Sequence, residues 1–366
     1  MSAAALSTPL QGWAEQIRAA GSAGQSLEMR GHGSKSFYGE RPRGELLDTR
    51  TFSGISSYEP SELVVTVKCG TPILELERAL AEKGQALAFE PPRFDRLGTI
   101  GGMVASGLSG PARVSQGSVR DHLLGALMLN GRGELLQFGG TVMKNVAGYD
   151  VSRLLAGSMG VLGLIAEVSL KVLPRPVAVT TLRFELGQSA ALNQLNRWGG
   201  KPLPLNASAW WDGALVLRLA GAQAAVQSAI AQLGGDVIED GMAAPFWEGL
   251  RDHSDEFFIG AARAVQGGAK LWRLSLPQTA PEIKMPGQQL IEWGGAQRWV
   301  VTPMPAAQVR EAVAQLGGHA TLFRSLDKSS GAFAPLAAPL MKIHRNLKAA
   351  FDPKNVFNPG RLYPDL

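Results

Sequence analysis

The sequence predicts an α+β protein with two domains and a C-terminal segment that packs back on the first. Three observations support this prediction. The first third alternates strand and helix patterns, residues 98–163 hold 15 of the 44 glycines, and residues 211–235 resemble residues 293–318. A chain of 366 residues is also longer than one ordinary hydrophobic core requires.

The first domain is expected over residues 1–175, beginning with a clear strand and helix. Residues 63–67 are mostly β-branched and indicate a buried strand. Thr71 is a candidate N-cap, Pro72 fits the first helical position, and Gly84 closes the helix. The domain therefore begins with a short helix that follows a buried strand.

The same domain is expected to end with a hairpin and a long strand. Residues 123–129 and 134–138 flank an Asn-Gly-Arg-Gly turn, which is typical of a β-hairpin. Residues 161–172 read as a strand that ends at Pro174 and Pro176. We place the domain boundary at these prolines.

The second domain is expected over residues 176–330 and contains the probable repeat. Both copies run strand, helix, Gly-Gly, strand, which predicts a small ferredoxin-like α+β cap with its helices on one face of the sheet. A chance likeness between two alanine-rich helices is the alternative. Residues 331–366 are expected to form a helix over 336–350 that stops before Pro353, followed by a compact turn.

Composition excludes several classes of function. The net charge is +5 and the pI about 9.4, but lysines and arginines form no long run or basic stripe, so we expect no nucleic-acid partner. An acidic protein partner or an anionic ligand explains the same excess. The single cysteine, Cys69, is expected to be a buried apolar residue, and one cysteine cannot hold an iron–sulfur cluster.

The expected location follows from the same features. One cysteine indicates a reduced, cytoplasmic protein. We expect no signal peptide, because residues 1–20 lack its pattern. We expect no membrane span, since no stretch of the sequence reaches 18 apolar residues. Contact with the inner membrane, if it occurs, would run through partner subunits.

Glycine-rich loops are the sequence's main chemical signal. A diphosphate requires backbone N–H groups at close range, and glycine allows that approach. The segment Arg30-Gly31-His32-Gly33-Ser34-Lys35 combines a tight backbone with hydroxyl and basic groups, although two glycines alone are a weak signal. The chain has neither a G-x-G-x-x-G turn between strand and helix nor a P-loop motif, which disfavours a Rossmann domain and a P-loop nucleotidase.

The order of several segments is more specific than any one of them, and it resembles the FAD-binding half of the vanillyl-alcohol-oxidase superfamily. The segments are residues 30–35, 98–102, 115–121, 144–150, 157–163, 351–353 and 358–360. Through residues 143–150 (Met-Lys-Asn-Val-Ala-Gly-Tyr-Asp), the chain resembles the smaller FAD-binding subunits of bacterial glycolate oxidases. The resemblance implies a two-lobed, PCMH-type FAD-binding domain in the first part of the chain.

The resemblance also implies which residues hold the cofactor. Residues 30–35 would cradle the pyrophosphate, and residues 101–102 and 106–109 would form a second flavin loop. Residues 157–165 would approach the ribityl chain and adenine, and Asn358 would close over the flavin. The implied FAD-binding set is Arg30, Gly31, His32, Gly33, Ser34, Lys35, Pro92, Thr99, Ile100, Gly101, Gly102, Ser106, Gly107, Ser109, Gly110, Ser118, Asp121, Gly157, Gly160, Gly163, Ile165 and Asn358.

The histidines argue against covalent flavin and against a metal. Relatives that attach FAD covalently carry a histidine where this chain has Ser34, so we expect FAD to be bound non-covalently. None of the five histidines has metal-ligand spacing, and His253, among charged neighbours, is expected to be solvated. His319 is expected at the start of a strand. No catalytic base is evident, so the catalytic residues stay unassigned and no metal is expected.

The resemblance implies a subunit of an FAD-dependent oxidoreductase that converts glycolate, or a related 2-hydroxy acid, to the 2-oxo acid. The partners implied are a larger FAD-binding catalytic subunit and an iron–sulfur subunit. Two alternatives remain open at this point: a non-catalytic scaffold subunit of that complex, and a stand-alone FAD-dependent sugar or lactone oxidase.

Overall fold

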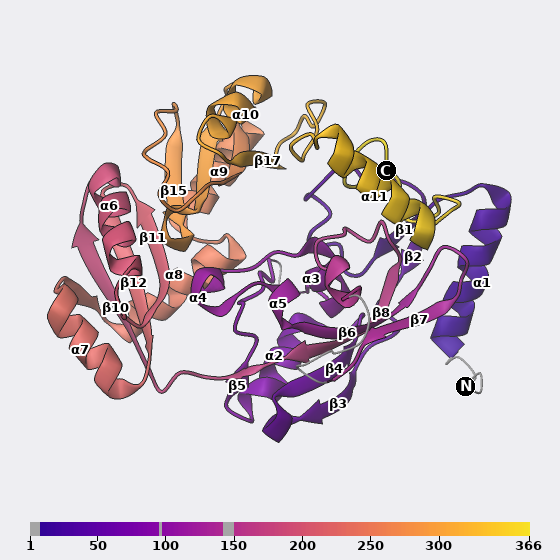
Figure 1. Cartoon of the computed structure of the whole chain (residues 1–366), viewed down its shortest axis with the longest axis horizontal. Helices are drawn as coiled ribbons and strands as arrows, with labels where there is room; N and C mark the ends of the chain where they lie inside the picture. Colours follow the sequence, from indigo (N-terminus) through magenta and orange to yellow (C-terminus); the bar gives the residue numbers. More distant parts are fainter. Residues whose placement is uncertain (1–7, 95–96, 142–149) are drawn as a thin grey trace.

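The computed structural model describes residues 8–94, 97–141 and 150–366. Two main sheets organise these residues, as Figure 1 shows. The larger helices are α1 Thr8–Ala23, α2 Ile73–Ala81, α3 Ile100–Ser106, α6 Gln188–Gly199, α7 Gln223–Leu233, α8 Asp240–Asp252, α9 Glu256–Gln266, α10 Ala306–Ala314 and α11 Ala338–Phe351. The short helices are α4 Arg113–Gln116 and α5 Val119–His122.

The first main sheet has five strands in the order β3-β4-β8-β6-β7, and each neighbouring pair is antiparallel. Its strands are β3 Ile55–Glu59, β4 Val64–Lys68, β6 Leu123–Leu129, β7 Leu135–Gly139 and β8 Leu164–Lys171. The predicted hairpin is β6–β7, and the predicted strand over 161–172 begins three residues later, at Leu164. Alternate residues of β4 face a core that also buries α2 and α3.

The helix α2 begins one residue later than the sequence predicts. Pro72 is its N-cap, and Thr71 is not. The Thr71 hydroxyl instead donates to Gly54 O at 3.2 Å and accepts from Gly54 N at 2.8 Å. The Thr71 side chain therefore binds the loop before β3, although its local sequence position predicts that it caps the helix.

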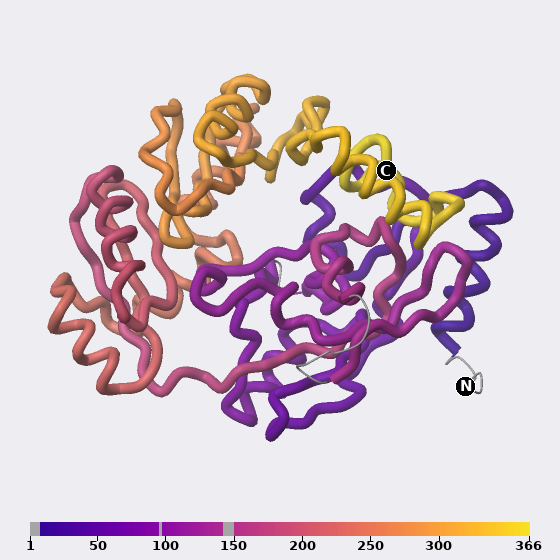
Figure 2. Tube along the Cα trace, in the orientation of Figure 1, coloured from indigo at the N-terminus to yellow at the C-terminus, as the bar shows by residue number. Residues whose placement is uncertain are grey.

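A smaller lobe forms around two parallel strands, β1 Leu27–Arg30 and β2 Glu45–Asp48. Helix α1 packs its apolar face on this pair, and the core includes Cys69 and Phe357. Leu27 also forms a β-bridge with Phe357, so the last part of the chain adds to the first strand. Figure 2 shows the yellow C-terminal trace returning to the indigo N-terminal part.

The second main sheet has eight strands in the order β13-β10-β12-β11-β15-β16-β14-β17. This order is symmetric about its centre, because β13, β10, β12 and β11 correspond in turn to β17, β14, β16 and β15. The first half, β10-α6-β11-β12-α7-β13, has the ferredoxin-like order. The strands are β10 Ala178–Glu185, β11 Leu205–Trp211, β12 Ala214–Gly221, β13 Asp236–Ile238, β14 Lys270–Ser275, β15 Gln288–Glu292, β16 Gln297–Thr302 and β17 His319–Arg324.

The symmetry of this sheet corresponds to the likeness between residues 211–235 and 293–318. The two matched segments contribute β12 and α7 in one half and β16 and α10 in the other, and β13 and β17 begin directly after them. His319 is the first residue of β17, as the sequence predicts. Both copies place Gly-Gly at the same point, between the helix and the edge strand.

Helices cover both faces of the eight-stranded sheet, so the prediction of one covered face is wrong. Helices α6, α7 and α10 pack on one face. Helices α8 and α9 pack on the other, where Trp247, Phe257 and Trp299 share a core with Tyr38 and Met159 of the first part of the chain. This second face therefore meets the lobes that carry the glycine-rich loops.

The linker between the sheets is short. The pair β5 Gln85–Ala86 and β9 Leu173–Pro174 closes the first part, and β10 begins at Ala178. We propose the division 1–175, 176–330 and 331–366, because among the described residues no strand of one main sheet pairs with a strand of the other. The division also assigns α11 and the turn after it to a separate returning segment.

The returning segment is fixed by a buried ion pair. Lys348 Nζ donates to Asp352 Oδ2 at 2.7 Å, and also to Val161 O and Phe357 O. Asp352 accepts in turn from the backbone N–H groups of Val356 and Phe357. Helix α11 ends at Phe351, before Pro353, as the sequence predicts.

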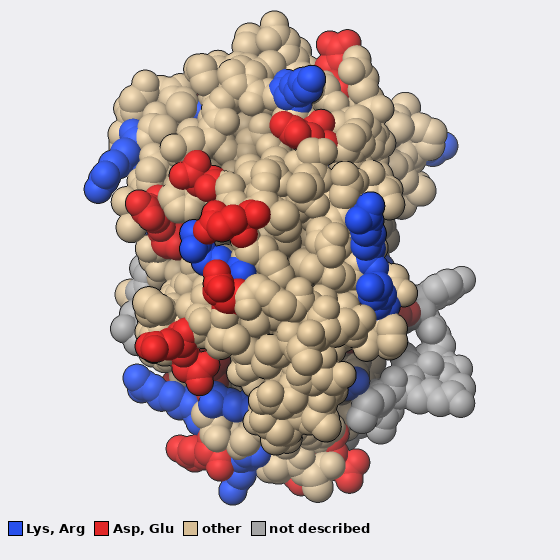
Figure 3. All heavy atoms as spheres, turned by 90° about the vertical axis from the view of Figure 1, so that its left-hand side faces the viewer, with Lys and Arg blue, Asp and Glu red and all other residues tan. Residues whose placement is uncertain are grey.

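The described helices include none that is both long and apolar enough to cross a bilayer. Figure 3 shows the face formed by the eight-stranded sheet and its helices. On this face, acidic and basic side chains lie close to one another, with broad uncharged areas between them.

Candidate functional site

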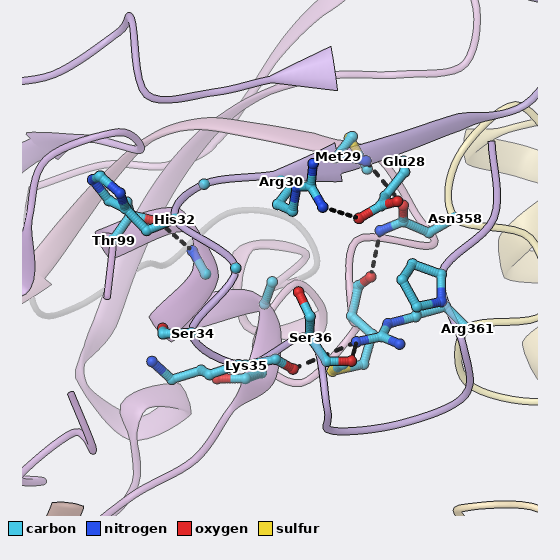
Figure 4. A pocket seen from close by; sticks show the side chains of 17 residues that line it. Glu28, Met29, Arg30, His32, Ser34, Lys35, Ser36, Thr99, Asn358 and Arg361 are labelled. Atoms are coloured by element: carbon cyan, nitrogen blue, oxygen red, sulfur yellow. Dashed lines mark hydrogen bonds and ion pairs between the residues drawn. The ribbon is translucent and has the colours of Figure 1, made fainter. Parts of the chain in front are cut away.

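Four segments that are far apart in the sequence line one continuous groove. They are residues 28–36 at the end of β1, residues 99–106 at the start of α3, residues 159–165 before and within β8, and residues 358–361 of the returning segment. Figure 4 shows the side chains around the outer part of this groove. The groove is thus built by both lobes and closed by the end of the chain.

The loop after β1 offers backbone donors to the groove. Gly33 has φ +79°, which lets the chain turn so that Ser36 N donates to Gly33 O at 2.9 Å. Within the described part of the chain, the backbone N–H groups of His32, Gly33 and Ser34 donate to no protein acceptor. A concave set of free N–H groups at a groove is suited to phosphate oxygens.

Two glycines make the close approach of the segments possible. A Cβ on Gly31 would lie 2.4 Å from Thr99 Oγ1, so the loop can contact the start of α3 only without a side chain there. A Cβ on Gly160, whose φ is +74°, would lie 2.7 Å from Asn358 Nδ2. These positions need glycine for packing, and the groove depends on that packing.

Asn358 joins three of the four segments. Its Oδ1 accepts from Met29 N at 3.0 Å, and its Nδ2 donates to Met159 O at 2.8 Å. Its own backbone is left-handed, with φ +42°, which asparagine tolerates better than most residues. Figure 4 shows the Asn358 side chain beside Met29 and Glu28 of β1. Asn358 therefore sets the distance across the groove.

Arg361 supplies a buried positive charge. It is 6% exposed, and its Nη2 donates to Ser36 O at 3.0 Å. Its Nη1 has no hydrogen-bond partner among the described residues. Burial lowers the pKa of Arg361 to about 10, which leaves it protonated at neutral pH. A buried guanidinium with a free donor, beside the free N–H groups of the loop, fits an anionic group such as a diphosphate.

The structure places fourteen of the residues expected from sequence on this groove. They are Arg30, Gly31, His32, Gly33, Ser34, Lys35, Thr99, Gly101, Gly102, Ser106, Gly160, Gly163, Ile165 and Asn358. Their role as cofactor ligands stays a prediction. The set holds backbone donors, hydroxyls and cations together, which is the combination that a flavin dinucleotide requires.

The remaining expected residues lie elsewhere. Ile100 is fully buried in the core of the five-stranded sheet, and Gly107 packs against Gly157. Ser118 and Asp121 form a capping box on the short helix α5, where Asp121 Oδ2 accepts from Ser118 N at 2.8 Å. These residues support the loops and do not line the groove.

Pro92, Ser109 and Gly110 line a different pocket. Residues 143–149, which carried much of the resemblance, lie outside the described residues. Sequence reasoning missed several lining residues: Glu28, Met29, Ser36, Pro42, Thr49, Cys69, Leu164, Ala105, Met159 and Arg361. Only Arg361 carried a usable signal, because it follows the Asn-Pro-Gly turn directly.

Glu28 is an acidic residue in this otherwise basic groove. Its carboxylate pairs with Arg30 Nη1 at 3.5 Å, and Arg30 remains 42% exposed. The pair leaves little net charge at this end of the groove. Arg361 contributes a further positive charge near the turn formed by residues 33–36, and the carboxylates of Glu28 and Glu40 stabilise its charged form.

Two other predictions about single residues can be compared with the structure. Cys69 is buried, as expected, and burial raises the pKa of its thiol to about 12, so it is not a thiolate. The expectation that His253 is solvated is wrong, because its ring stacks on Phe258 at a centroid distance of 3.7 Å. The described residues contain no cluster of His, Cys, Asp and Glu that could hold a metal ion.

Known proteins resemble this chain in sequence and in fold. The model of the FAD-binding domain family matches residues 11–152, which include the loop after β1 and the start of α3. The solved structure of an alkyldihydroxyacetonephosphate synthase superposes with a TM-score of 0.64 and 15% identity. That superposition covers 94% of this chain and 73% of the other, and it shows the shared fold.

Three curated relatives are informative. Glycolate oxidase subunit GlcD of Bacillus subtilis is 33% identical over 42% of this chain and 33% of its own length. D-lactate dehydrogenase of Anaerostipes hadrus is 33% identical over 38% of this chain and 29% of its own length. Glycolate oxidase subunit GlcE of Escherichia coli K12 is 45% identical over 96% of this chain and 97% of its own length.

The first two relatives match only a part of this chain, and this chain spans about a third of their length. The similarity to GlcE, in contrast, runs through both main sheets and the returning segment. Since it covers nearly all of both proteins, this chain belongs to the FAD-binding family of the glycolate oxidase subunit GlcE.

Proposed function

We propose that this chain is the FAD-binding subunit of a multi-subunit glycolate oxidase, in which it handles flavin electrons beside a larger FAD-binding catalytic subunit and an iron–sulfur subunit. The 45% identity to GlcE over nearly the whole chain is the observation that carries the proposal. The groove supports it, because its donors and its buried cation suit a dinucleotide. The proposed location is the cytoplasm, with any contact with the inner membrane made by partners.

Bound FAD would supply a two-electron acceptor, and the chain's own residues would position it. The free N–H groups of His32, Gly33 and Ser34, with Arg361, would hold the diphosphate. Gly101, Gly102 and Ser106 would lie along one side of the cofactor, and Gly160, Gly163 and Ile165 along the other. His32 is proposed to hydrogen-bond without a covalent link to the flavin.

The test compares two alanine variants in the full chain. In Gly160→Ala the new Cβ would lie 2.7 Å from Asn358 Nδ2, at a left-handed φ, and we expect at least a tenfold loss of FAD affinity. In the control Gly199→Ala, at the end of α6, the Cβ meets nothing within 4 Å. We expect the control to bind FAD like the unaltered chain.

The measurements are a visible spectrum and FAD titration of each purified chain, followed by acid precipitation. Yellow colour that stays in the acid pellet would contradict non-covalent binding. A folded, unaltered chain that takes up no FAD would refute the proposed function.

A second measurement distinguishes an electron-carrying subunit from a scaffold. Glycolate turnover is measured in the complex assembled with either variant. An electron-carrying role predicts that turnover falls with the FAD content of this subunit. Unchanged turnover in a complex that lacks this flavin would instead support the scaffold alternative.

A further inference from the structure

One edge of the eight-stranded sheet has an open backbone. Strand β10 pairs with β12 along its whole length, Ala178–Glu185. On its other side β13 pairs only with Thr181–Arg183, so residues 178–180 face no strand there within the described part of the chain. The opposite edge is partly covered, because Leu322 N of β17 donates to Ala332 O. The start of β10 therefore offers backbone groups that could pair with a further strand.

Exposed apolar side chains accompany this open edge. Val177, directly before β10, is 86% exposed, and Val179 is 44% exposed. Natural proteins usually protect a strand edge with charged residues, proline or a covering segment, because an open apolar edge pairs readily with other chains. Pro176 limits pairing ahead of Val177, but residues 177–180 carry no charge. An edge of this composition indicates a surface that another chain covers.

A groove with a volume of about 640 Å³ lies against the open edge. It is lined by residues 176–181 and by Ala243, Ala244 and Trp247 of α8, which recur at helical spacing and so share one side of that helix. Glu90 of the first part of the chain lines it as well. Figure 1 shows the linker running from the five-stranded sheet to the start of β10. The groove thus lies where the two main sheets are joined.

The two arginines that line the groove are already paired. Arg218 Nη2 lies 2.8 Å from Glu90 Oε1, and Arg251 Nη2 lies 2.9 Å from Asp252 Oδ2. Glu248 also lines the groove, is 66% exposed and lies 3.7 Å from Arg251. Because both guanidinium groups have a carboxylate partner, the groove does not favour an anionic occupant.

The border of the groove is acidic. Asp236 of β13, Glu239 and Asp240 lie in succession up to the first turn of α8, and none of them has an ion pair within the described part of the chain. One basic residue, Arg175, lies at the other end, directly before Pro176. The border therefore keeps a net negative charge, which is complementary to a segment that carries Lys or Arg.

We propose that a partner subunit inserts an extended segment with at least one basic residue into this groove, where it adds a strand to β10. Backbone hydrogen bonds to residues 178–180 provide affinity, and alternate side chains pack on Val179 and the small residues of α8. The basic side chain meets Asp240 and the carboxylates beside it. The inference rests on the proposed function, because that function places this chain in a multi-subunit complex.

The first test locates the partner segment by cross-linking. The chain is assembled with the larger FAD-binding subunit and the iron–sulfur subunit. Cys69, its one cysteine, is 1% exposed, so Val177→Cys can be labelled selectively with a photoactivatable maleimide. We expect a cross-link to a partner segment that contains Lys or Arg, identified by mass spectrometry. The labelled chain without its partners is the control and should form no cross-link.

Two variants with the same new side chain test the groove itself. Val179→Lys places a positive charge on the face of β10 where Thr181 Oγ1 accepts from Trp247 of α8, and it should weaken partner affinity about tenfold or more. Val237→Lys is the matched control. Val237 is 59% exposed and pairs with Leu182, whose side chain lies on the opposite face of the sheet. Its partner affinity should be unchanged.

The acidic border is tested with Asp240→Asn. Removing one of the three carboxylates should weaken partner affinity about threefold at low salt. The difference should disappear at about 1 M salt, where charges are screened beyond about 3 Å. An effect on folding alone would be similar at both salt concentrations, so the salt dependence distinguishes charge complementarity from a structural change.

Hydrogen exchange of residues 177–180 should be slower in the complex than in the free chain, because added backbone hydrogen bonds protect amides. Unchanged exchange there in an assembled complex would overturn this inference and leave the proposed function in place. Equal partner affinity of Val179→Lys and Val237→Lys would do the same. A cross-link from Val177→Cys to a second copy of this chain would also overturn it.

Failure of the proposed function gives different results. An unaltered chain that binds FAD but forms no complex with the two subunits would refute both the docking site and the proposed assembly. An unaltered chain that assembles, shows the cross-link and takes up no FAD would refute the proposed role of the flavin while supporting the docking site.

Discussion

Glu292 is a fully buried carboxylate whose hydrogen-bond donors, Trp299 and Gln297, are both neutral. Without a basic partner, the charged form loses its hydration and gains no compensating ion pair. Burial therefore raises the pKa of Glu292 from 4.5 to about 7 in the folded chain. Such a residue makes folding stability depend on pH.

The sign of that dependence follows from the proton balance. Between pH 4.5 and 7 the folded chain keeps the Glu292 proton and the unfolded chain releases it. Stability from this residue is then present at low pH and is lost as the pH rises toward 7. Above pH 7 both states are ionised, and the contribution no longer changes.

Glu292→Gln should remove this dependence, because an amide keeps an oxygen for Trp299 and Gln297 and cannot ionise. Relative to the unaltered chain, the variant should gain about 3 kcal/mol in free energy of unfolding between pH 4.5 and pH 8. Urea unfolding of both chains at the two pH values measures this difference. If the two chains differed by the same free energy of unfolding at pH 4.5 and at pH 8, the raised pKa of Glu292 would be contradicted.

At the scale of an element, helix α11 is unusual because its one buried residue is a lysine. Lys348 donates to Val161 O, Phe357 O and Asp352 Oδ2, so one ammonium joins the helix, the residues before β8 and the turn after the helix. A buried ion pair stabilises a fold little more than an apolar pair would. Removing one partner is strongly destabilising, however, because the other charge stays buried without compensation.

Lys348→Met should therefore lower the free energy of unfolding by about 3–5 kcal/mol, since Asp352 would keep its charge without a cation. Arg345→Met is the control on the same helix. Its partner Asp365 is exposed, and surface pairs of this kind contribute little. Urea unfolding of both variants is the measurement. Equal midpoints for the two variants would show that Lys348 does not fix the segment.

Local sequence patterns predicted those elements whose signals lie within a few residues. The hairpin β6–β7 follows from its turn, and the end of α11 follows from Pro353. The two halves of the eight-stranded sheet follow from the repeat. Helices α8 and α9 could not be placed on the second face, because they lie between the repeated segments and have no counterpart in the repeat.

Contacts between distant residues were the least predictable part. His253 has charged sequence neighbours, but Arg251 and Asp252 pair with each other, and a left-handed backbone turns His253 into a cluster of aromatic rings. Arg361 meets the loop at Ser36, 325 residues earlier in the chain. No local sequence pattern indicates either contact. The groove glycines could be predicted from the sequence, because a glycine widens the range of conformations open to its own backbone.

At the scale of the whole molecule, the groove depends on the return of the chain. The first and last parts meet at the Leu27–Phe357 bridge, and Asn358 and Arg361 contribute to the groove from the last ten residues. The apolar cores around α6, α7 and α10, in contrast, contain no residue of the returning segment. Folding of the second sheet and formation of the groove should therefore be separable.

Asn358→Gly tests this dependence with a small change. Glycine accepts the left-handed φ of +42°, so the backbone should be kept while the hydrogen bonds to Met29 N and Met159 O are lost. Two hydrogen bonds at about 1 kcal/mol each predict a loss of FAD affinity of about 10- to 30-fold.

Deleting residues 337–366 should have a larger effect of the same kind. The deletion removes Asn358, Arg361 and the Lys348 anchor together, so FAD should not be retained. Hydrogen exchange should rise in β1 and α1, which lose Val356 and Phe357 from their shared core, and should stay low in β12 and β16. FAD binding by the shortened chain would mean that the first two parts form the cofactor site without the returning segment.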